Sequence, residues 1–328
     1  MIFYLTIIIS LNLIFIFYHK QISQKINIYD VPDSFRKLHK SKTALTGGIL
    51  LYLNVLAYSF FYFLTESISS YFFLNNFDFL IFLISCSLVF FVGMFDDKKN
   101  LSPNSKFFLL LIIITPSILV IDNLLIDKVR LSFLENEINL NNFSIFWTIL
   151  CMLLFINAVN MFDGINLQTS TYFLFQALFL GIFTKFDPIL FLFLISILIF
   201  SILNSKSKSF LGDSGSLLLA YIFACLFIIL YNKNLKIYSD EIVLIMIIPG
   251  IELLRLFATR ILQKKNPFKP DRNHLHHILL KKNSFFITSL IIQTLIILPT
   301  VISLLFGKTI IILIVTIILY FFILKKNY

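Results

Sequence analysis

The sequence predicts an all-α, polytopic integral membrane protein: a single domain, residues 1–328, with about ten or eleven transmembrane helices. Hydrophobic residues make up 59% of the chain and charged residues 13%, and the mean hydropathy is +0.92. A soluble domain cannot hide so much apolar surface. Apolar stretches of roughly 17–22 residues also recur along the whole length, and this is the length that crosses a hydrocarbon core.

The first four expected spans are residues 2–18, 48–65, 77–94 and 106–122. No Lys or Arg precedes the first apolar run and positive charges follow it, so we expect a retained anchor rather than a cleaved signal peptide. The second span begins after a tight glycine turn, and the third ends just before two adjacent aspartates. Pro116 lies inside the fourth, which membrane helices tolerate.

Seven further spans follow, separated by short polar joins. Pro249-Gly250 interrupts the ninth span of the series and predicts a break that bends its inner half outward. The segment before the fifth, around 123–142, reads as an irregular loop. These spans are residues 143–160, 168–184, 188–203, 214–231, 241–262, 285–306 and 309–324.

Lys and Arg predict the orientation. If residues 19–47 are cytoplasmic and the spans alternate, 21 of the 27 Lys and Arg residues fall on the inner side. The N-terminus is then outside and the C-terminus is cytoplasmic. The net charge of +10 follows from this topology and from anionic lipid, so no nucleic-acid partner is expected. The inner loops, which we expect to form the active face, are 19–47, 95–106, 161–167, 204–213 and 263–284.

Carboxylates mark three of these inner loops. Asp96 and Asp97 are adjacent at a span end, where two anions near low dielectric need a cation. Mg²⁺ suits carboxylate and phosphate oxygens, whereas the plainer interpretation is a helix end solvated by Lys98 and Lys99. Asp213 opens a span within GDSGS, a pattern that favours phosphate or is simply a helix cap.

A polar stripe and a histidine cluster add to the same face. Asn157, Asn160 and Asp163 share one side of a helix, which indicates either a water-filled cleft or interhelical hydrogen bonds. The histidines His274, His276 and His277 follow Arg272. Their spacing disfavours zinc and favours a cationic cradle for a diphosphate. Two residues of the first loop reach the same cleft, unless that loop is merely solvated: Lys37 and His39.

Together these motifs resemble the polyprenyl-phosphate N-acetylhexosamine-1-phosphate transferases of glycosyltransferase family 4, and most of all the undecaprenyl-phosphate N-acetylglucosamine-1-phosphate transferase branch. The resemblance covers nearly the whole chain in order. Its motifs are Asp30-Val-Pro-Asp33 to His39, Gly47-Gly48, Asp96-Asp97, Asn157 to Gly164, Gly212 to Ser216, and Asp271 to His277.

The resemblance implies a UDP-N-acetylhexosamine donor, such as UDP-N-acetylglucosamine, and undecaprenyl phosphate as acceptor. It implies Mg²⁺ as cofactor, with Mn²⁺ as the alternative ion, and release of UMP to start a lipid-linked cell-surface glycan such as O-antigen. The enzyme would lie in the bacterial inner membrane with a cytoplasmic active site. A homodimer is compatible with this interpretation.

The resemblance also implies residue roles. Asp96, Asp97, His274, His276 and His277 would be catalytic. The metal would lie at Asp97 and Asp213. The residues expected to bind substrate are Lys37, His39, Asn157, Asn160, Asp163 and Arg272.

Two positions depart from the family pattern, because Asn100 and Asn166 stand where aspartates are frequent. They keep open a catalytically inactive relative as an alternative. A secondary transporter is the other alternative, since polar residues within membrane helices also mark transport sites. A transporter, however, should carry its acids near the middle of the membrane rather than at the inner ends of spans.

Overall fold

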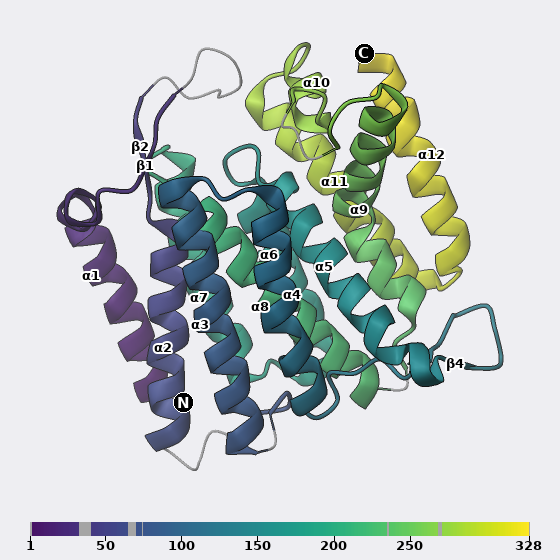
Figure 1. Ribbon diagram of the computed structural model, residues 1–328, viewed down its shortest axis with the longest axis horizontal. Helices are drawn as coiled ribbons and strands as arrows, with labels where there is room; N and C mark the ends of the chain where they lie inside the picture. The colour runs from purple at the N-terminus through teal and green to yellow at the C-terminus, as the bar shows by residue number, and fades with distance from the viewer. Residues whose placement is uncertain are drawn as a thin grey trace.

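The computed structural model describes residues 2–32, 41–64, 70–73, 75–234, 236–267 and 271–327, and it confirms the all-α membrane fold (Figure 1). In these ranges ten helices are long and apolar enough to cross a membrane, and the 17-residue α6 is an eleventh long helix. The helices are α1 (Ile2–Ile26), α2 (Gly47–Leu64), α3 (Asn76–Lys99), α4 (Pro103–Val120), α5 (Ser144–Phe162), α6 (Gln168–Thr184), α7 (Pro188–Ser205), α8 (Gly212–Lys233), α9 (Ser239–Leu262), α10 (Leu275–Leu280), α11 (Phe285–Phe306) and α12 (Thr309–Asn327).

The structure differs from the predicted spans mainly at their polar ends. The first helix continues past the apolar run to Ile26, and α3 continues to Lys99, so Asp96 and Asp97 lie in its last turns rather than in a loop. A polar residue ends a hydrophobic run without ending a helix, because backbone hydrogen bonding continues outside the apolar layer. The predicted break at Pro249-Gly250 was wrong, since α9 is continuous from Ser239 to Leu262.

A small sheet joins two of the loops predicted to be on the active face. Strand β2 (Thr43–Leu45) pairs antiparallel with β1 (Tyr29–Asp30) and parallel with β5 (Ser209–Phe210). In Figure 1 this sheet, α10 and the C-terminus lie at one end of the helix bundle, and the N-terminus lies at the other. The hairpin of β3 (Lys128–Val129) and β4 (Ile138–Asn139) also belongs to the far end. We call the end with α10 the α10 end and the opposite end the far end.

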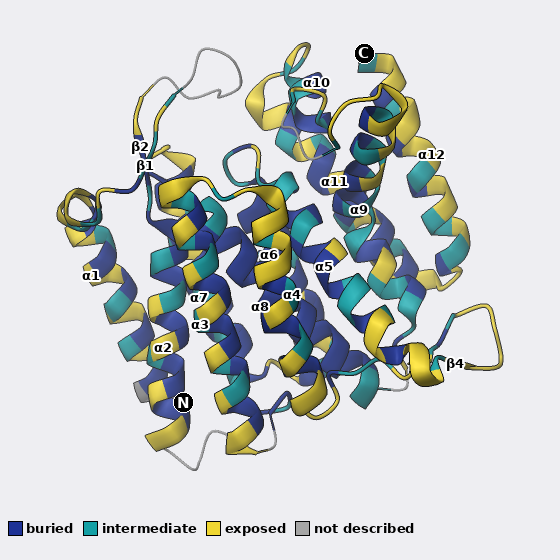
Figure 2. Cartoon of the chain, in the orientation of Figure 1, coloured by how far each residue is buried: buried dark blue, intermediate teal, exposed yellow. Residues whose placement is uncertain are grey.

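Helix α8 is the centre of the bundle. Its apolar window is 100% buried, whereas that of α1 is 17% buried, so α8 contacts protein on every side and α1 mostly faces lipid. Helices α2, α3, α5 and α6 pack directly against it. Figure 2 shows the exposed residues gathered on the outer faces of the peripheral helices. The first turn of α8, which contains Asp213, is therefore fixed by its neighbours.

The approach of α3 to α8 is close enough to require glycine. A Cβ atom on Gly93 would lie 2.5 Å from the carbonyl oxygen of Asp213 and 2.5 Å from the Cα of Ser214. Similarly, a Cβ on Gly48 of α2 would lie 2.5 Å from the backbone nitrogen of Gly215. The chain thus brings α2 and α3 against the backbone of the α8 N-terminus, which no side chain could allow without a shift.

We expect Gly93→Ala to destabilise the protein by about 2–3 kcal/mol, because overpacking against backbone atoms forces the helices apart. The matched control is Gly250→Ala in α9, where a Cβ would meet nothing within 4 Å. Removing a glycine from a helix interior there should be neutral or stabilising by up to about 1 kcal/mol. Thermal unfolding of both variants in the same detergent checks the difference, and equal midpoints would contradict the close approach.

Candidate active site

The two acidic motifs meet at the N-terminus of α8. The Asp97 carboxylate accepts hydrogen bonds from the backbone N–H groups of Asp213, at 2.7 Å, and Ser214, at 3.0 Å. These N–H groups have no partner within the helix, and the helix dipole favours a negative charge beside them. Gly212 has a positive φ of 72°, and a Cβ on it would lie 2.7 Å from Asp97 Oδ2. The GDSGS turn is therefore shaped around the Asp97 carboxylate.

The Asp213 side chain is the centre of a second set of contacts. Its Oδ1 accepts a hydrogen bond from Asn160 Nδ2 at 2.5 Å, and its Oδ2 lies 2.9 Å from Lys106 Nζ. Asn160 also donates to Ser216 Oγ at 2.9 Å. The side chain of Asp213 thus links α8 to α5 through Asn160 and to α4 through Lys106.

Lys106 also pairs with Asp96, so one ammonium group serves two carboxylates. Only 15% of the lysine side chain is exposed, and the Asp96 side chain is also buried. Asp96 also accepts a hydrogen bond from Leu101 N–H at 2.6 Å, which fixes the chain where α3 ends. Asp96, Asp97 and Asp213 therefore form one acidic cluster that Lys106 partly neutralises.

Both departures from the family pattern have local structural partners. Asn100 ends α3 in the left-handed conformation with φ 52°, which asparagine tolerates better than most residues, and its N–H bonds to Asp96 O at 2.8 Å. Asn166 Nδ2 donates to Ser207 Oγ at 2.8 Å and so joins the loops 161–167 and 204–213. Neither asparagine disturbs the acidic cluster.

The histidine motif lies against the same loop. A Cβ on Gly164 would lie 2.1 Å from Cε1 of His276, so the imidazole packs directly on the backbone beside Asp163. His276 is buried, and its ring centroid is 5.3 Å from that of His274 and 4.4 Å from that of His277. Burial, together with the two neighbouring histidines, holds the pKa of His276 well below its usual range, so this ring is neutral at pH 7.

The remaining predicted residues are placed less centrally. The Asn157 amide donates to Leu153 O in its own helix at 2.7 Å, and Arg272 is exposed in the segment before α10. Lys37 and His39 lie outside the described residues, as do Asp33, Arg36 and Lys269. The structure therefore brings together Asp96, Asp97, Asn160 and Asp213, and it places Asp163 and the histidines beside them.

Sequence reasoning missed several residues of this neighbourhood. Lys106 entered only as a topological charge, although a single cation at the start of an apolar run was an available signal. Glu252 and Arg255, three residues apart within an apolar span, form an ion pair at 2.9 Å next to the histidine motif. Charges inside a membrane helix are rare enough to have indicated a special role.

The donor set of the acidic cluster fits a metal ion only in part. The described residues contain no group of three or more His, Cys, Asp or Glu side chains arranged to hold an ion. Asp97 and Asp213 are adjacent, and each carboxylate oxygen has a lone pair beyond those in the hydrogen bonds above. Mg²⁺ is commonly held by one or two carboxylates together with substrate phosphates and water. The pair fits that mode, in which the substrate completes the coordination.

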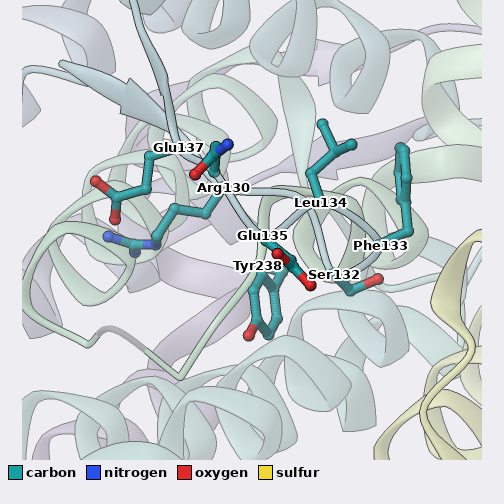
Figure 3. A pocket seen from close by; sticks show the side chains of 8 residues that line it. Arg130, Ser132, Phe133, Leu134, Glu135, Glu137 and Tyr238 are labelled. Carbon is teal, nitrogen blue, oxygen red and sulfur yellow. The ribbon is translucent and has the colours of Figure 1, made fainter.

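One sizeable cavity does not belong to this site. It measures about 420 Å³ and lies at the far end of the bundle, between the β3–β4 segment and the start of α9 (Figure 3). Its lining residues are Arg130, Ser132, Phe133, Leu134, Glu135, Asn136, Glu137 and Tyr238. A cavity of about 10 Å³ does adjoin the histidine motif and is lined by Gln168, Glu252 and His276, among others.

We expect Asp163 to make stability depend on pH. Burial, with the charge of Asp213, raises the pKa of Asp163 to about 7, against an unfolded value near 4. The folded state therefore binds the extra proton between about pH 4 and 7, and the free energy of unfolding falls as pH rises through that window. Relative to the Asp163→Asn variant, the wild type should lose on the order of 2 kcal/mol by pH 8, after discounting for partial exposure.

Thermal unfolding in detergent at pH 5, 6, 7 and 8 tests this expectation. The control is Asp122→Asn, which removes a carboxylate that is exposed to solvent. A difference in stability between Asp163→Asn and the wild type that stayed constant from pH 5 to pH 8 would contradict the raised pKa of Asp163.

Comparison with known proteins agrees with the motifs. The model of glycosyl transferase family 4 matches residues 79–231, which include the acidic cluster and Asn160. The chain is 27% identical over 281 residues to the undecaprenyl-phosphate alpha-N-acetylglucosaminyl 1-phosphate transferase of Salmonella typhi, covering 81% of this chain and 73% of the relative.

Two further relatives span a wider range of bacteria. The enzyme of the same name from Escherichia coli (strain K12) is 25% identical, again over 81% of this chain and 73% of the relative. A probable undecaprenyl-phosphate N-acetylglucosaminyl 1-phosphate transferase of Bacillus subtilis is 26% identical over 273 residues, covering 80% and 72%. Residues 79–231 thus match the model of glycosyl transferase family 4, which is the family that the motifs of the sequence resemble.

Proposed function

We propose that this protein transfers N-acetylglucosamine-1-phosphate from UDP-N-acetylglucosamine to undecaprenyl phosphate and releases UMP. The observation that carries the proposal is the position of Asp213, which contacts Lys106 and Asn160 through its side chain and Asp97 through its backbone. The names of the relatives support the acceptor and the sugar, since they are undecaprenyl-phosphate N-acetylglucosaminyl 1-phosphate transferases. The product would be the first lipid-linked intermediate of a cell-surface glycan.

In the proposed reaction an oxygen of the lipid phosphate attacks the phosphorus nearest the sugar. The bond from that phosphorus to the oxygen bridging to UMP breaks, and UMP leaves with the electron pair. Both reactants are anionic, so positive charge and fixed geometry supply most of the rate acceleration. Lys106 supplies positive charge at the acidic cluster, whereas the N–H groups of Asp213 and Ser214 are already bound to Asp97.

The adjacent aspartates Asp96 and Asp97 have different partners, and we infer different roles for them. Asp97 is committed to the backbone of α8 and so shapes the turn that presents Asp213. Because Asp97 is already bound to two backbone N–H groups, we assign any proton transfer from the lipid phosphate to its neighbour Asp96. Asn160 orients the Asp213 carboxylate, and neutral His276 with its neighbours would contact the diphosphate.

Magnesium is part of the proposal. Asp97 and Asp213 would hold the ion, which would neutralise the developing charge on the diphosphate as a Lewis acid. Mn²⁺ is expected to substitute for it. The role of Lys106 is then to balance the third carboxylate, because three adjacent anions exceed the charge of one divalent ion.

The proposed location is the bacterial inner membrane, with the α10 end toward the cytoplasm. This orientation rests on the Lys and Arg count, and it would let the soluble donor reach the site from the cytoplasm. The acidic cluster lies at helix ends, since Asp97 is near the end of α3 and Asp213 is in the first turn of α8. A site at the end of the bundle suits one soluble and one lipid substrate, and it argues against a transporter with a site at mid-membrane.

The direct test uses purified protein in detergent with radiolabelled UDP-N-acetylglucosamine and undecaprenyl phosphate. We expect label to enter the organic phase, UMP to form in equal amount, and EDTA to stop both until Mg²⁺ or Mn²⁺ is restored. Parallel reactions with UDP-N-acetylgalactosamine define the sugar. A folded protein that transfers no label from either donor would support the inactive relative and contradict the proposal.

A further inference from the structure

A buried carboxylate outside the acidic cluster holds the segment that carries the histidines. Glu252 lies in α9 and is only 4% exposed. Its Oε1 accepts a hydrogen bond from Arg255 Nη2 at 2.9 Å and another from Leu275 N–H at 2.8 Å. Its Oε2 accepts from Arg255 Nε at 3.3 Å and from the hydroxyl of Tyr320. The four hydrogen bonds compensate the cost of burying the charge.

These contacts join three elements that are distant in the sequence. Glu252 and Arg255 belong to α9, Tyr320 belongs to α12, and Leu275 is the first residue of α10. A carboxylate that accepts from the first N–H of a helix stabilises the helix N-terminus. Arg255 Nη2 also donates to the carbonyl of Asn273 at 2.6 Å. The backbone just before and at the start of α10 is therefore held by both partners of one ion pair.

Helix α10 needs such support because it has only six residues. An isolated helix of that length is unstable in water, so its position depends on tertiary contacts. Burial of Leu275, Ile278 and Leu279 supplies the apolar part of those contacts. The hydrogen bonds of Glu252 and Arg255 supply the directional part, which sets where the helix begins.

The position of α10 sets the position of the imidazoles. His274 Nδ1 lies 3.7 Å from Glu252 Oε1, and His276 is packed on Gly164 beside Asp163. Glu252 and His276 also line the same small cavity of about 10 Å³. A shift of α10 by even part of a turn would move His276 off the loop that joins it to the acidic cluster.

We propose that Glu252, together with Arg255 and Tyr320, is a positioning group that fixes the histidine motif at the reaction site. This inference rests on the proposed function for its effect on catalysis, but its effect on α10 does not. Glu252 is a positioning residue rather than a catalytic one, because it acts on the reactants through the histidines. The three side chains have no other assigned part in the transfer.

The first test measures α10 directly and needs no enzymatic activity. Hydrogen exchange of the backbone amides of residues 275–280 should be at least tenfold faster in Glu252→Gln than in the wild type. Tyr320→Phe removes one hydrogen bond and should show a smaller increase of about threefold. The matched control is Glu241→Gln. It alters a carboxylate that caps the N-terminus of α9, the helix that contains Glu252, and it should leave the exchange of the α10 amides unchanged. Unchanged exchange in Glu252→Gln would overturn the proposal.

The second test is a double-mutant cycle between Glu252→Gln and His276→Gln, measured as kcat/KM for transfer. Alone, Glu252→Gln should lower kcat about 10- to 100-fold with less than a threefold change in KM for the UDP-sugar. In the His276→Gln background it should cost less than threefold, because it acts through that ring. Equal costs in both backgrounds would mean that Glu252 only supports general folding.

The two tests separate the possible failures. If the wild type transfers no label but exchange at α10 still depends on Glu252, the proposed function fails and the positioning of α10 stands. If the wild type is active but exchange is unchanged or the cycle is additive, the positioning role fails and the proposed function stands.

Discussion

Asp213→Asn should lower the rate of UMP release by about 10³-fold or more while the protein still folds and inserts. The substitution keeps the size of the side chain and removes the charge that pairs with Lys106 at 2.9 Å. Removing one group that stabilises charge in the transition state typically costs about 10²- to 10³-fold, and the loss of a metal ligand adds to that cost. The Asp97 carboxylate still caps α8 in the variant, so the fold has no reason to change. Single-turnover release of UMP from radiolabelled UDP-sugar gives the rate.

The control for this experiment is Asp122→Asn, which removes an exposed carboxylate just beyond α4 at the far end. It should retain at least half of the wild-type rate. We expect Asp97→Asn to be as inactive as Asp213→Asn, because it removes the carboxylate around which the GDSGS turn is built. Near-normal turnover in both inactive candidates would contradict the assignment of the acidic cluster.

Lys106→Met should destabilise the protein and impair transfer at the same time. The variant leaves the Asp96 and Asp213 carboxylates without the cation that both contact. Breaking a buried ion pair by removing one partner typically costs about 3–5 kcal/mol, and the partial exposure of Asp213 should reduce this to about 2–3 kcal/mol. We expect kcat to fall at least 100-fold, since Lys106 is the only described side-chain cation in contact with the acidic cluster.

The control for Lys106→Met is an ion pair at the protein surface. Lys128 pairs with Glu137 at 2.8 Å, but its side chain is 54% exposed and it lies at the far end of the bundle. Lys128→Met should therefore change the free energy of unfolding by less than about 1 kcal/mol and leave kcat unchanged. Thermal unfolding and turnover of both variants in one detergent decide the matter. Comparable effects in the two variants would contradict the role of Lys106 in stabilising the acidic cluster and in catalysis.

Much of the fold was predictable because a membrane span must satisfy its backbone internally and present apolar side chains. Helix α6 begins and ends at the predicted residues 168 and 184, as α11 does at 285 and 306. The helix ends outside the apolar layer were not predictable in this way. The α1 segment after His19 and the last turn of α3 are polar helices, which a hydrophobic run does not reveal.

The sequence predicted that the acidic motifs lie close together, but it did not predict which residues they contact. Topology placed Asp97 and Asp213 on one side, and the structure puts them in hydrogen-bond contact. Asp97 can bind the backbone of α8 only because α3 approaches α8 closely. Gly93 allows this approach, since a side chain at that position would clash with the α8 backbone. The partners Lys106 and Glu252 depend in the same way on helix packing, which the periodicity of a uniformly apolar helix does not encode.

The most direct measurement is an experimental structure with UDP-N-acetylglucosamine and Mn²⁺, in which anomalous scattering locates the ion. If the acidic cluster is the reaction site, one Mn²⁺ should be bound by oxygens of Asp97 or Asp213 and by the diphosphate. Lys106 and His276 should lie beside the same phosphates. A diphosphate bound at the far end of the bundle, or an ion remote from Asp213, would contradict the account.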